Sequence, residues 1–244
     1  MKVLGVIMIH YGSDYLEYCL RSMFPVCEKV VILYSMEPTH QGRSDLLCPD
    51  TRSKLKAIAD KFPTEWVDVY NKKGEGEHLG EIWNHTDGYD VLVRSDYDEV
   101  WEPFFLQQAV EQVYRSPYRN HGINGFINFW RSFDYYFTDG FLPVRLFHLR
   151  EKNTQKEPAI RATVYHFGYA IKPIWMKYKL SIHGHRGELK ADWFNIWDKW
   201  NPSITEGKFH PVSNDIWLNV QKFNKEDLPE FMKSHPYFNQ QIIR

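Results

Sequence analysis

Three carboxylates follow directly on an apolar segment near the middle of the chain. The stretch VLVRSDYDEVWEP begins at Val91 and leads into Asp96, Asp98 and Glu99. Like charges repel, so the cluster needs a counter-charge, which Arg94 could supply only in part. In an extended strand, residues two apart face the same side, so Asp96 and Asp98 could reach one ion. Their oxygen atoms suit Mg²⁺ or Mn²⁺, whereas the alternative is a solvated turn that caps the next helix.

The elements that precede this cluster favour the ion site. Apolar runs predict buried strands, and apolar positions at helical spacing between them predict helices. The expected strands are residues 3–9, 29–34, 65–70 and 89–94, and the expected helices are 15–23, 50–62, 78–85 and 104–114. This alternation predicts an α/β protein with a doubly wound parallel sheet, in which ligands bind beyond the carboxyl ends of the strands. His10 and Tyr11, the loop from Ser35, the loop at Gly74 and the acidic cluster all fall at that edge.

The second half of the chain has a different pattern. Longer runs at residues 122–137, 143–149 and 162–170 predict strands that could pair antiparallel. Helices are expected at 174–180, 213–223 and 228–233. We therefore expect one continuous domain, with an αβ half at 1–115 and a second half with a C-terminal appendage at 116–244.

Composition excludes several classes of protein. The 244 residues carry a formal net charge of −1, so no overall field attracts nucleic acid or an anionic membrane. Three cysteines without a CxxC pair argue against a zinc site or a disulfide framework and predict reduced thiols in a cytoplasmic protein. The N-terminal apolar run is too short to span a bilayer and lacks the features of a signal peptide, and no transmembrane segment is expected.

Several motifs together resemble those of the nucleotide-sugar-dependent glycosyltransferases of the GT-A fold, specifically the family-2-like group. The matching segments are VIMIHYGSDYLEYCLRSM, VVILYS, VLVRSDYDEVW and YHFGYA. The resemblance covers the first half well and residues 141–200 loosely. It implies a Rossmann-like, mainly parallel sheet with a small antiparallel part and a helical C-terminal appendage. Residues 1–115 would then bind the nucleotide sugar, and residues 116–244 would form the acceptor side.

The resemblance implies transfer of a sugar from a nucleoside-diphosphate sugar to an acceptor hydroxyl, with Mn²⁺ or Mg²⁺ as cofactor. Asp98 matches the direct metal ligand, and Asp96 matches the residue that contacts the ribose or reaches the metal through water. His166 in YHFGYA matches a third ligand, with His183 and His185 as substitutes. For His166 alone, a packed and hydrogen-bonded strand histidine is the alternative.

Donor-binding residues follow from the same resemblance. His10, Tyr11 and Gly12 match the turn that contacts the nucleobase, but the second strand ends in Tyr34 and Ser35 where the family has an acid, which leaves the base open. Gly76, Glu77 and His78 match the segment of the family that lies over the donor, so they are expected to contact it. Arg94, which precedes the acidic cluster, is expected to contact the donor as well. Lys177 and Lys179 could clamp a diphosphate, although a solvated helix face is favoured for them.

An inverting transferase needs a general base near the acceptor hydroxyl. The resemblance places it after the fifth strand, where Asp134 is the candidate and Asp139 the alternative. Loop capping is the competing role for both carboxylates. The aromatic residues of FWRSFDYY could form an acceptor platform, and at least half of them are expected in the core.

The sequence leaves alternatives open for the acceptor and for the class of reaction. A glycan is the first expectation for the acceptor, and a modified pyrimidine in DNA is narrower, since the net charge offers nucleic acid little support. A nucleotidyltransferase would be expected to carry a Gly-rich, basic loop after its first strand, which IHYGSDYLEY lacks. An inactive binding module that keeps the fold is the remaining alternative.

Overall fold

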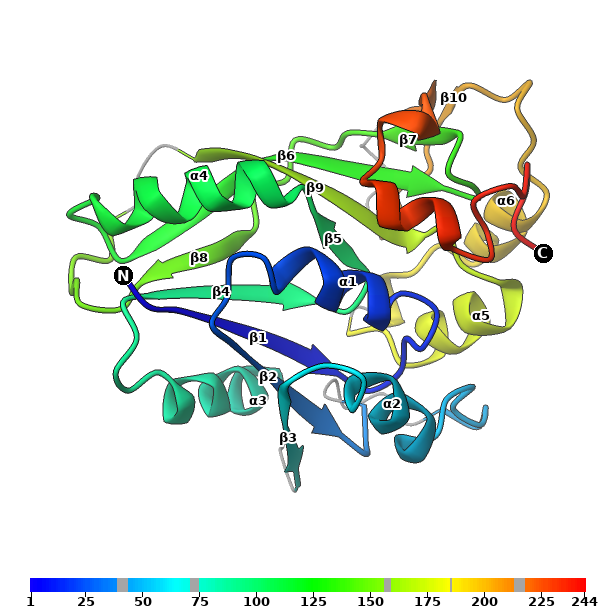
Figure 1. Cartoon of the computed structure of the whole chain (residues 1–244). Helices are drawn as coiled ribbons and strands as arrows, with labels where there is room; N and C mark the ends of the chain where they lie inside the picture. The colour runs from blue at the N-terminus through cyan, green and yellow to red at the C-terminus, as the bar shows by residue number, and fades with distance from the viewer. Residues whose placement is uncertain (39–43, 71–74, 156–158, 185, 213–217) are drawn as a thin grey trace.

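A computed structural model describes residues 1–38, 44–70, 75–155, 159–184, 186–212 and 218–244 (Figure 1). In the first half, strands alternate with helices: β1 (Val3–Ile9), α1 (Leu16–Met23), β2 (Lys29–Ser35), α2 (Arg52–Ala59), β3 (Thr64–Val69), α3 (Glu75–Glu81), the 3₁₀ turn η1 (Ile82–His85), β4 (Val91–Asp96), β5 (Glu99–Trp101) and α4 (Pro103–Tyr114). Each predicted strand and helix of this half is present, with ends that differ by a few residues.

The second half adds longer strands and short C-terminal elements. They are β6 (Asn120–Trp130), β7 (Tyr135–Phe137), β8 (Val144–His148), β9 (Ile160–Tyr169), α5 (Pro173–Ser181), η2 (Arg186–Glu188), α6 (Trp193–Asp198), β10 (Glu206–Gly207), β11 (Leu218–Asn219), β12 (Gln221–Lys222), η3 (Lys225–Asp227) and η4 (Glu230–Ser234). The strands expected at 143–149 and 162–170 and the helix expected at 174–180 are present, whereas residues 131–134 divide the run expected at 122–137 into β6 and β7. Strand β9 pairs antiparallel with β5, as expected, but parallel with β6.

One sheet joins the two halves of the chain. Its described strands run in the order β12-β7-β6-β8-β4-β1-β2-β3, and β9 pairs with β6 and β5. The neighbours β3, β2, β1 and β4 are parallel, whereas β8 is antiparallel to both β4 and β6. The predicted α/β fold is confirmed as a mixed sheet with a parallel core of β3, β2, β1 and β4, and its antiparallel extension is larger than the small part that was predicted. The functional division at residue 115 stays a prediction.

Helices cover both faces of the parallel strands, as a doubly wound sheet requires. Alternate residues of a strand face opposite sides, and β1 is buried on both. Ile7 packs with the helices α1, α2 and α4, whereas Val6 packs with α3 and η1 on the other face. The carboxyl ends of these strands lie together, because Met8 is paired with Asp96 and Ile9 with Tyr34.

The C-terminal appendage is less helical than predicted. Of the helix expected at 213–223, residues 213–217 lie outside the described residues, and the helix is wrong for the rest, which holds β11 and β12. Leu218 and Val220 are buried while Asn219 and Gln221 are exposed, and this period of two is that of a strand. The helix expected at 228–233 is instead the 3₁₀ turn η4, which ends before Pro236. Among the described residues, no helix has the length and apolarity needed to cross a bilayer.

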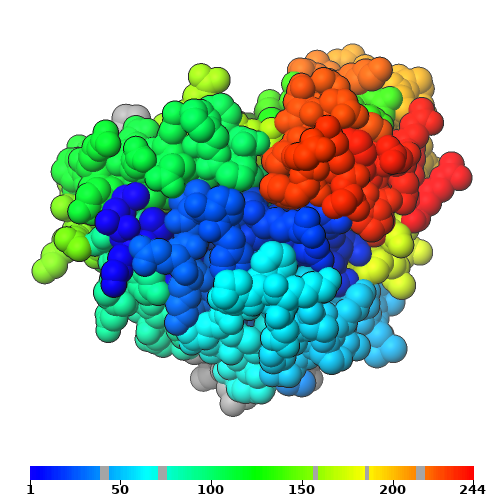
Figure 2. Space-filling view, viewed as in Figure 1, coloured from blue at the N-terminus to red at the C-terminus, as the bar shows by residue number. Residues whose placement is uncertain are grey.

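The C-terminal segment packs against the start of α1, and Figure 2 shows its red surface directly beside the blue N-terminal surface. His235 makes this contact: its Nε2 donates to the Asp14 carbonyl at 2.9 Å, and its Nδ1 accepts from the Tyr237 N–H at 3.0 Å. The ring also stacks on Tyr15. Both ring nitrogens are used by the neutral imidazole, so a second proton would break the bond to Tyr237.

This contact predicts a loss of stability in acid. Burial lowers the pKa of His235 to about 4, below its ordinary value of 6.5. The unfolded chain therefore binds the proton first, and the free energy of unfolding falls as pH drops from about 6.5 to 4, by up to about 3 kcal/mol. Urea unfolding of the protein and of His235→Gln across that range measures the effect. Subtracting the free energy of unfolding of His235→Gln from that of the parent at each pH cancels the contribution of the other titrating groups. A difference that does not change with pH would contradict the prediction.

Candidate functional site

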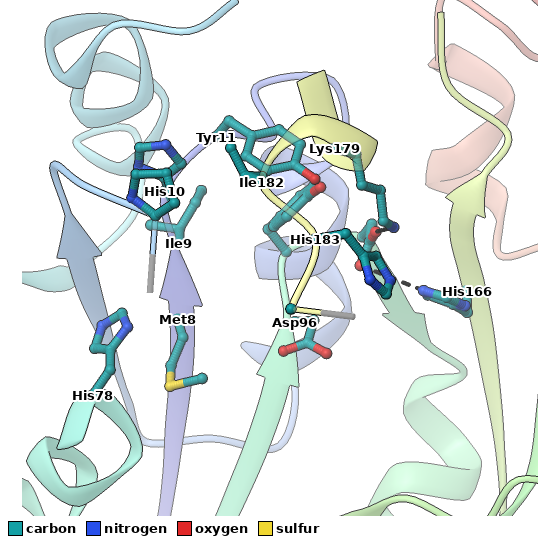
Figure 3. Close-up of a pocket in the computed structure, with 14 residues that line it drawn as sticks. Met8, Ile9, His10, Tyr11, His78, Asp96, His166, Lys179, Ile182 and His183 are labelled. Atoms are coloured by element: carbon teal, nitrogen blue, oxygen red, sulfur yellow. Dashed lines mark hydrogen bonds and ion pairs between the residues drawn. The ribbon is translucent and has the colours of Figure 1, made fainter. Parts of the chain in front are cut away.

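A pocket of about 390 Å³ opens at the carboxyl ends of β1 and β4 (Figure 3). Side chains from β1, α3, the turn after β4, β9 and α5 converge on it. Of the residues predicted from the sequence, the pocket brings together His10, Tyr11, His78, Asp96, Asp98 and His166, and also Lys179 and His183, which the sequence offered as the less favoured clamp and as a substitute ligand. This is the sheet edge at which the sequence placed the site.

Asp96 and Asp98 do not share an extended strand, so this part of the prediction is wrong. Strand β4 ends at Asp96, and Tyr97 and Asp98 form the turn into β5. The Glu99 carboxylate holds this turn by accepting from the Asp96 N–H at 3.1 Å. The Asp98 carbonyl in turn accepts from the Phe167 N–H at 2.8 Å, which ties the turn to β9.

Arg145 in β8 supplies a counter-charge that was not predicted from the sequence. Its Nη2 lies 2.5 Å from Asp96 Oδ2 and 2.5 Å from Glu99 Oε1, and its Nε donates to Glu99 at 3.0 Å. Glu99 is almost completely buried, and burial raises its pKa to about 7 even though Arg145 opposes that change. The signal in the sequence was the arginine inside the apolar strand PVRLFHL, because a buried charge requires a partner.

Asp98 faces two other side chains. Its side chain is only 4% exposed, with Oδ1 at 3.7 Å from His166 Nε2 and Oδ2 at 3.5 Å from Lys179 Nζ. Lys179 also donates to the Gly168 carbonyl at 3.2 Å. A Cβ at position 168 would lie 2.5 Å from His166 Nε2 and 2.8 Å from Lys179 Nζ, so glycine makes room for both.

The two lysines of α5 therefore differ. The expected solvated helix face is wrong for Lys179, which points into the pocket in Figure 3 and is half-buried. Lys177 is exposed, with its ammonium 5.1 Å from the ring centroid of Phe194. Spacing along the helix separates the two side chains but does not say which one meets Asp98, which depends on how α5 packs.

His166 is oriented by Asn128 in β6. Its Nδ1 donates to Asn128 Oδ1 at 2.7 Å, and burial lowers the pKa of the imidazole. The neutral ring then carries its lone pair on Nε2, which is the nitrogen that faces Asp98. A second hydrogen bond of this kind is what fixes the tautomer and direction of metal-binding histidines.

The turn after β1 forms the opposite wall of the pocket. His10 Nδ1 donates to the Ser35 carbonyl at 2.8 Å, and its Nε2 accepts from the Tyr178 hydroxyl at 2.6 Å. Gly12 has φ +128°, and its N–H donates to Asp50 Oδ2 at 2.8 Å. The sequence offered Asp50 only as the start of a helix, so this support for the turn was not predicted.

Other predicted site residues lie outside the pocket lining. Asp134, the predicted base, lies 3.6 Å from Lys225 Nζ, and its carbonyl accepts from the Phe223 N–H. The Asp139 carboxylate accepts from the N–H of Phe141 in its own loop, which is the capping contact of the alternative, whereas the Asp134 carboxylate faces Lys225 instead. The remaining predicted residues that do not line the pocket are Gly12, Gly76, Glu77 and Arg94, and His185 lies outside the described residues.

The predicted aromatic platform is largely core. Phe129, Trp130 and Phe133 are fully buried, whereas Tyr135 and Tyr136 keep some exposure. Within the described part of the chain, no three or more His, Cys, Asp or Glu side chains form a group that could hold a metal ion. Asp98 and His166 are thus a pair of donors rather than a closed cage.

The chain is distantly similar in structure to known transferases. Glucosyl-3-phosphoglycerate synthase from Mycobacterium tuberculosis, solved with Mn²⁺, UDP and phosphoglyceric acid, is 17% identical with a TM-score of 0.36, over 53% of this chain and 43% of that one. TarS from S. aureus is 12% identical with a TM-score of 0.35, over 52% and 35%. A cytidylyltransferase from Leptospira borgpetersenii is 16% identical with a TM-score of 0.39, over 61% of each chain.

No model of a known protein family matches the chain, and no curated protein matches it in sequence. Structural similarities this distant carry no information about activity.

Proposed function

We propose that this protein is a metal-dependent glycosyltransferase, which moves a sugar from a nucleoside-diphosphate sugar to an acceptor hydroxyl. The observation that carries the proposal is the pair Asp98 Oδ1 and His166 Nε2. The two atoms lie 3.7 Å apart at the carboxyl edge of a parallel sheet, and both offer lone pairs. That edge is where open α/β sheets bind their ligands.

A divalent cation fits between these two donors. Carboxylate oxygens and imidazole nitrogens bind divalent metals, so Asp98 and His166 are the residues that would hold such an ion here. Mg²⁺ takes oxygen ligands almost exclusively, so a mixed pair favours Mn²⁺. Two protein ligands leave positions for the oxygen atoms of a diphosphate, and a cation bound there supplies Lewis-acid neutralisation of the departing group.

The other pocket residues then have defined roles. Asp96 keeps one oxygen on Arg145, and we propose that the other contacts the donor ribose or a water on the metal. His10 and Tyr11 would line the nucleobase, with Gly12 shaping the turn between them and α1. His78 lines the same pocket from α3, so the donor would extend between α3 and β9. The acceptor we propose is a glycan hydroxyl, as the resemblance implies.

The proposal predicts that Asp98→Asn loses metal-dependent nucleotide binding. Calorimetry with UDP, GDP and CDP in Mn²⁺ should show binding to the parent protein. In the variant the affinity should fall at least about 100-fold, because removal of a direct metal ligand costs no less affinity than removal of a residue that only orients a ligand. Asp60→Asn removes one acid from an exposed pair with Lys56 and serves as the matched control. Equal nucleotide affinity in Asp98→Asn and the parent would overturn the assignment.

Turnover separates the remaining reaction classes. Release of a nucleoside diphosphate from a sugar nucleotide in Mn²⁺ supports the glycosyltransferase. Release of pyrophosphate from a nucleoside triphosphate and a sugar phosphate would instead indicate a nucleotidyltransferase. Metal-dependent binding of sugar nucleotides without any turnover would indicate an inactive binding module.

A further inference from the structure

We infer that Lys179 makes metal binding and diphosphate binding at this pocket depend on each other, so that each ligand raises the affinity for the other. This inference rests on the proposed function, since it takes Asp98 and His166 as the metal ligands. The observation behind it is that Lys179 Nζ already lies 3.5 Å from Asp98 Oδ2, on the second oxygen of the same carboxylate.

Before any ligand binds, Lys179 is the cation that Asp98 faces. A carboxylate that is only 4% exposed is costly to bury without a counter-charge. Arg145, another cation nearby, is already committed to Asp96 and Glu99 through short hydrogen bonds. The ammonium of Lys179 therefore stabilises the empty site through a longer and weaker contact.

The same ammonium opposes a metal ion that binds alone. An ion between Asp98 and His166 would lie within a few ångströms of Lys179, and like charges in a half-buried site repel strongly. The metal must also share a carboxylate that Lys179 partly neutralises. Lys179 therefore lowers the affinity of the pocket for the free cation.

A diphosphate reverses this effect. Its negative charges attract both the metal and Lys179, and the lysine side chain is a flexible stem with a compact charge that can follow them. Lys179 lines the same pocket as Asp98, so its ammonium can turn from the carboxylate to a phosphate without movement of α5. Because coupling between two ligands is reciprocal, the diphosphate raises the affinity for the metal by the same factor as the metal raises the affinity for the diphosphate.

The test measures two affinities in the parent protein and in Lys179→Met. Free Mn²⁺ is titrated by electron paramagnetic resonance, and pyrophosphate, which represents the diphosphate of any nucleotide, is titrated by calorimetry in saturating Mn²⁺. We expect Lys179→Met to bind Mn²⁺ alone about tenfold more tightly and pyrophosphate about tenfold more weakly, within the usual range of coupling energies. Lys179→Arg keeps the charge and should restore both affinities.

Lys177→Met is the matched control, because it removes the same charge from the exposed face of the same helix. It should leave both affinities unchanged. If Lys179→Met binds Mn²⁺ as tightly as the parent or more weakly, the inference is overturned and the proposed function stays intact. Mn²⁺ binding that survives in Asp98→Asn would overturn both.

Discussion

Arg145→Met is expected to lower the free energy of unfolding by about 3–5 kcal/mol, the usual cost of removing one partner from a buried ion pair. Arg145 is 10% exposed and holds Glu99, which is 1% exposed, together with Asp96. Methionine would fill much of the volume but would leave two carboxylates side by side without their cation. The turn of Asp96, Tyr97 and Asp98 would lose its anchor at the same time.

Urea unfolding at several pH values measures this loss. Burial raises the pKa of Glu99 and the loss of Arg145 would raise it further, so the variant should recover part of its stability as pH falls and Glu99 takes up a proton. Arg145→Met combined with Glu99→Gln should recover stability at neutral pH for the same reason. Arg115→Met, which removes a 79% exposed partner of Glu111, should cost no more than about 1 kcal/mol. A similarly small loss in Arg145→Met would show that the carboxylates have another counter-charge.

Gly12→Ala is expected to destabilise the protein by at least about 2 kcal/mol and to weaken nucleotide binding. Gly12 has φ +128°, a conformation that residues with a side chain rarely adopt. Its added Cβ would also lie 1.9 Å from Cδ2 of the Tyr97 ring. The Tyr97 ring lines the pocket and packs on Tyr11 with 5.2 Å between ring centroids, so a displaced ring would change the shape of the pocket.

Gly88→Ala is the control that separates the cost of backbone strain from the cost of a steric collision with a neighbouring side chain. Gly88 has φ +83°, but nothing lies within 4 Å of the Cβ that it would gain. It should cost only the conformational penalty of about 1–2 kcal/mol and leave nucleotide binding unchanged. Thermal unfolding and calorimetry with UDP in Mn²⁺ compare the two variants. Equal effects of both substitutions on binding would contradict a role for the contact between Gly12 and Tyr97.

Local patterns in the sequence determined the frame of this protein. Apolar runs such as residues 3–9 and 29–34 are typical of strands covered on both faces, and the helices between them indicate a parallel sheet. Since parallel strands end at one edge, His10, Tyr11, Asp96 and Asp98 had to approach one another there. The pocket contains these four residues and His166, each of which was expected from the sequence.

Only the tertiary structure decided how these residues are paired. Arg145 meets Asp96 and Glu99 because β8 runs antiparallel to β4, and Lys179 meets Asp98 because of the way α5 packs over the end of β9. Asp134 is the base that the resemblance implied, and the loop after β6 places its carboxylate 3.6 Å from Lys225 Nζ. Pairing between segments distant in sequence depends on register and packing, which no local period encodes. The sequence therefore determined which edge of the sheet holds the site, and the tertiary structure decided which charges face each other in it.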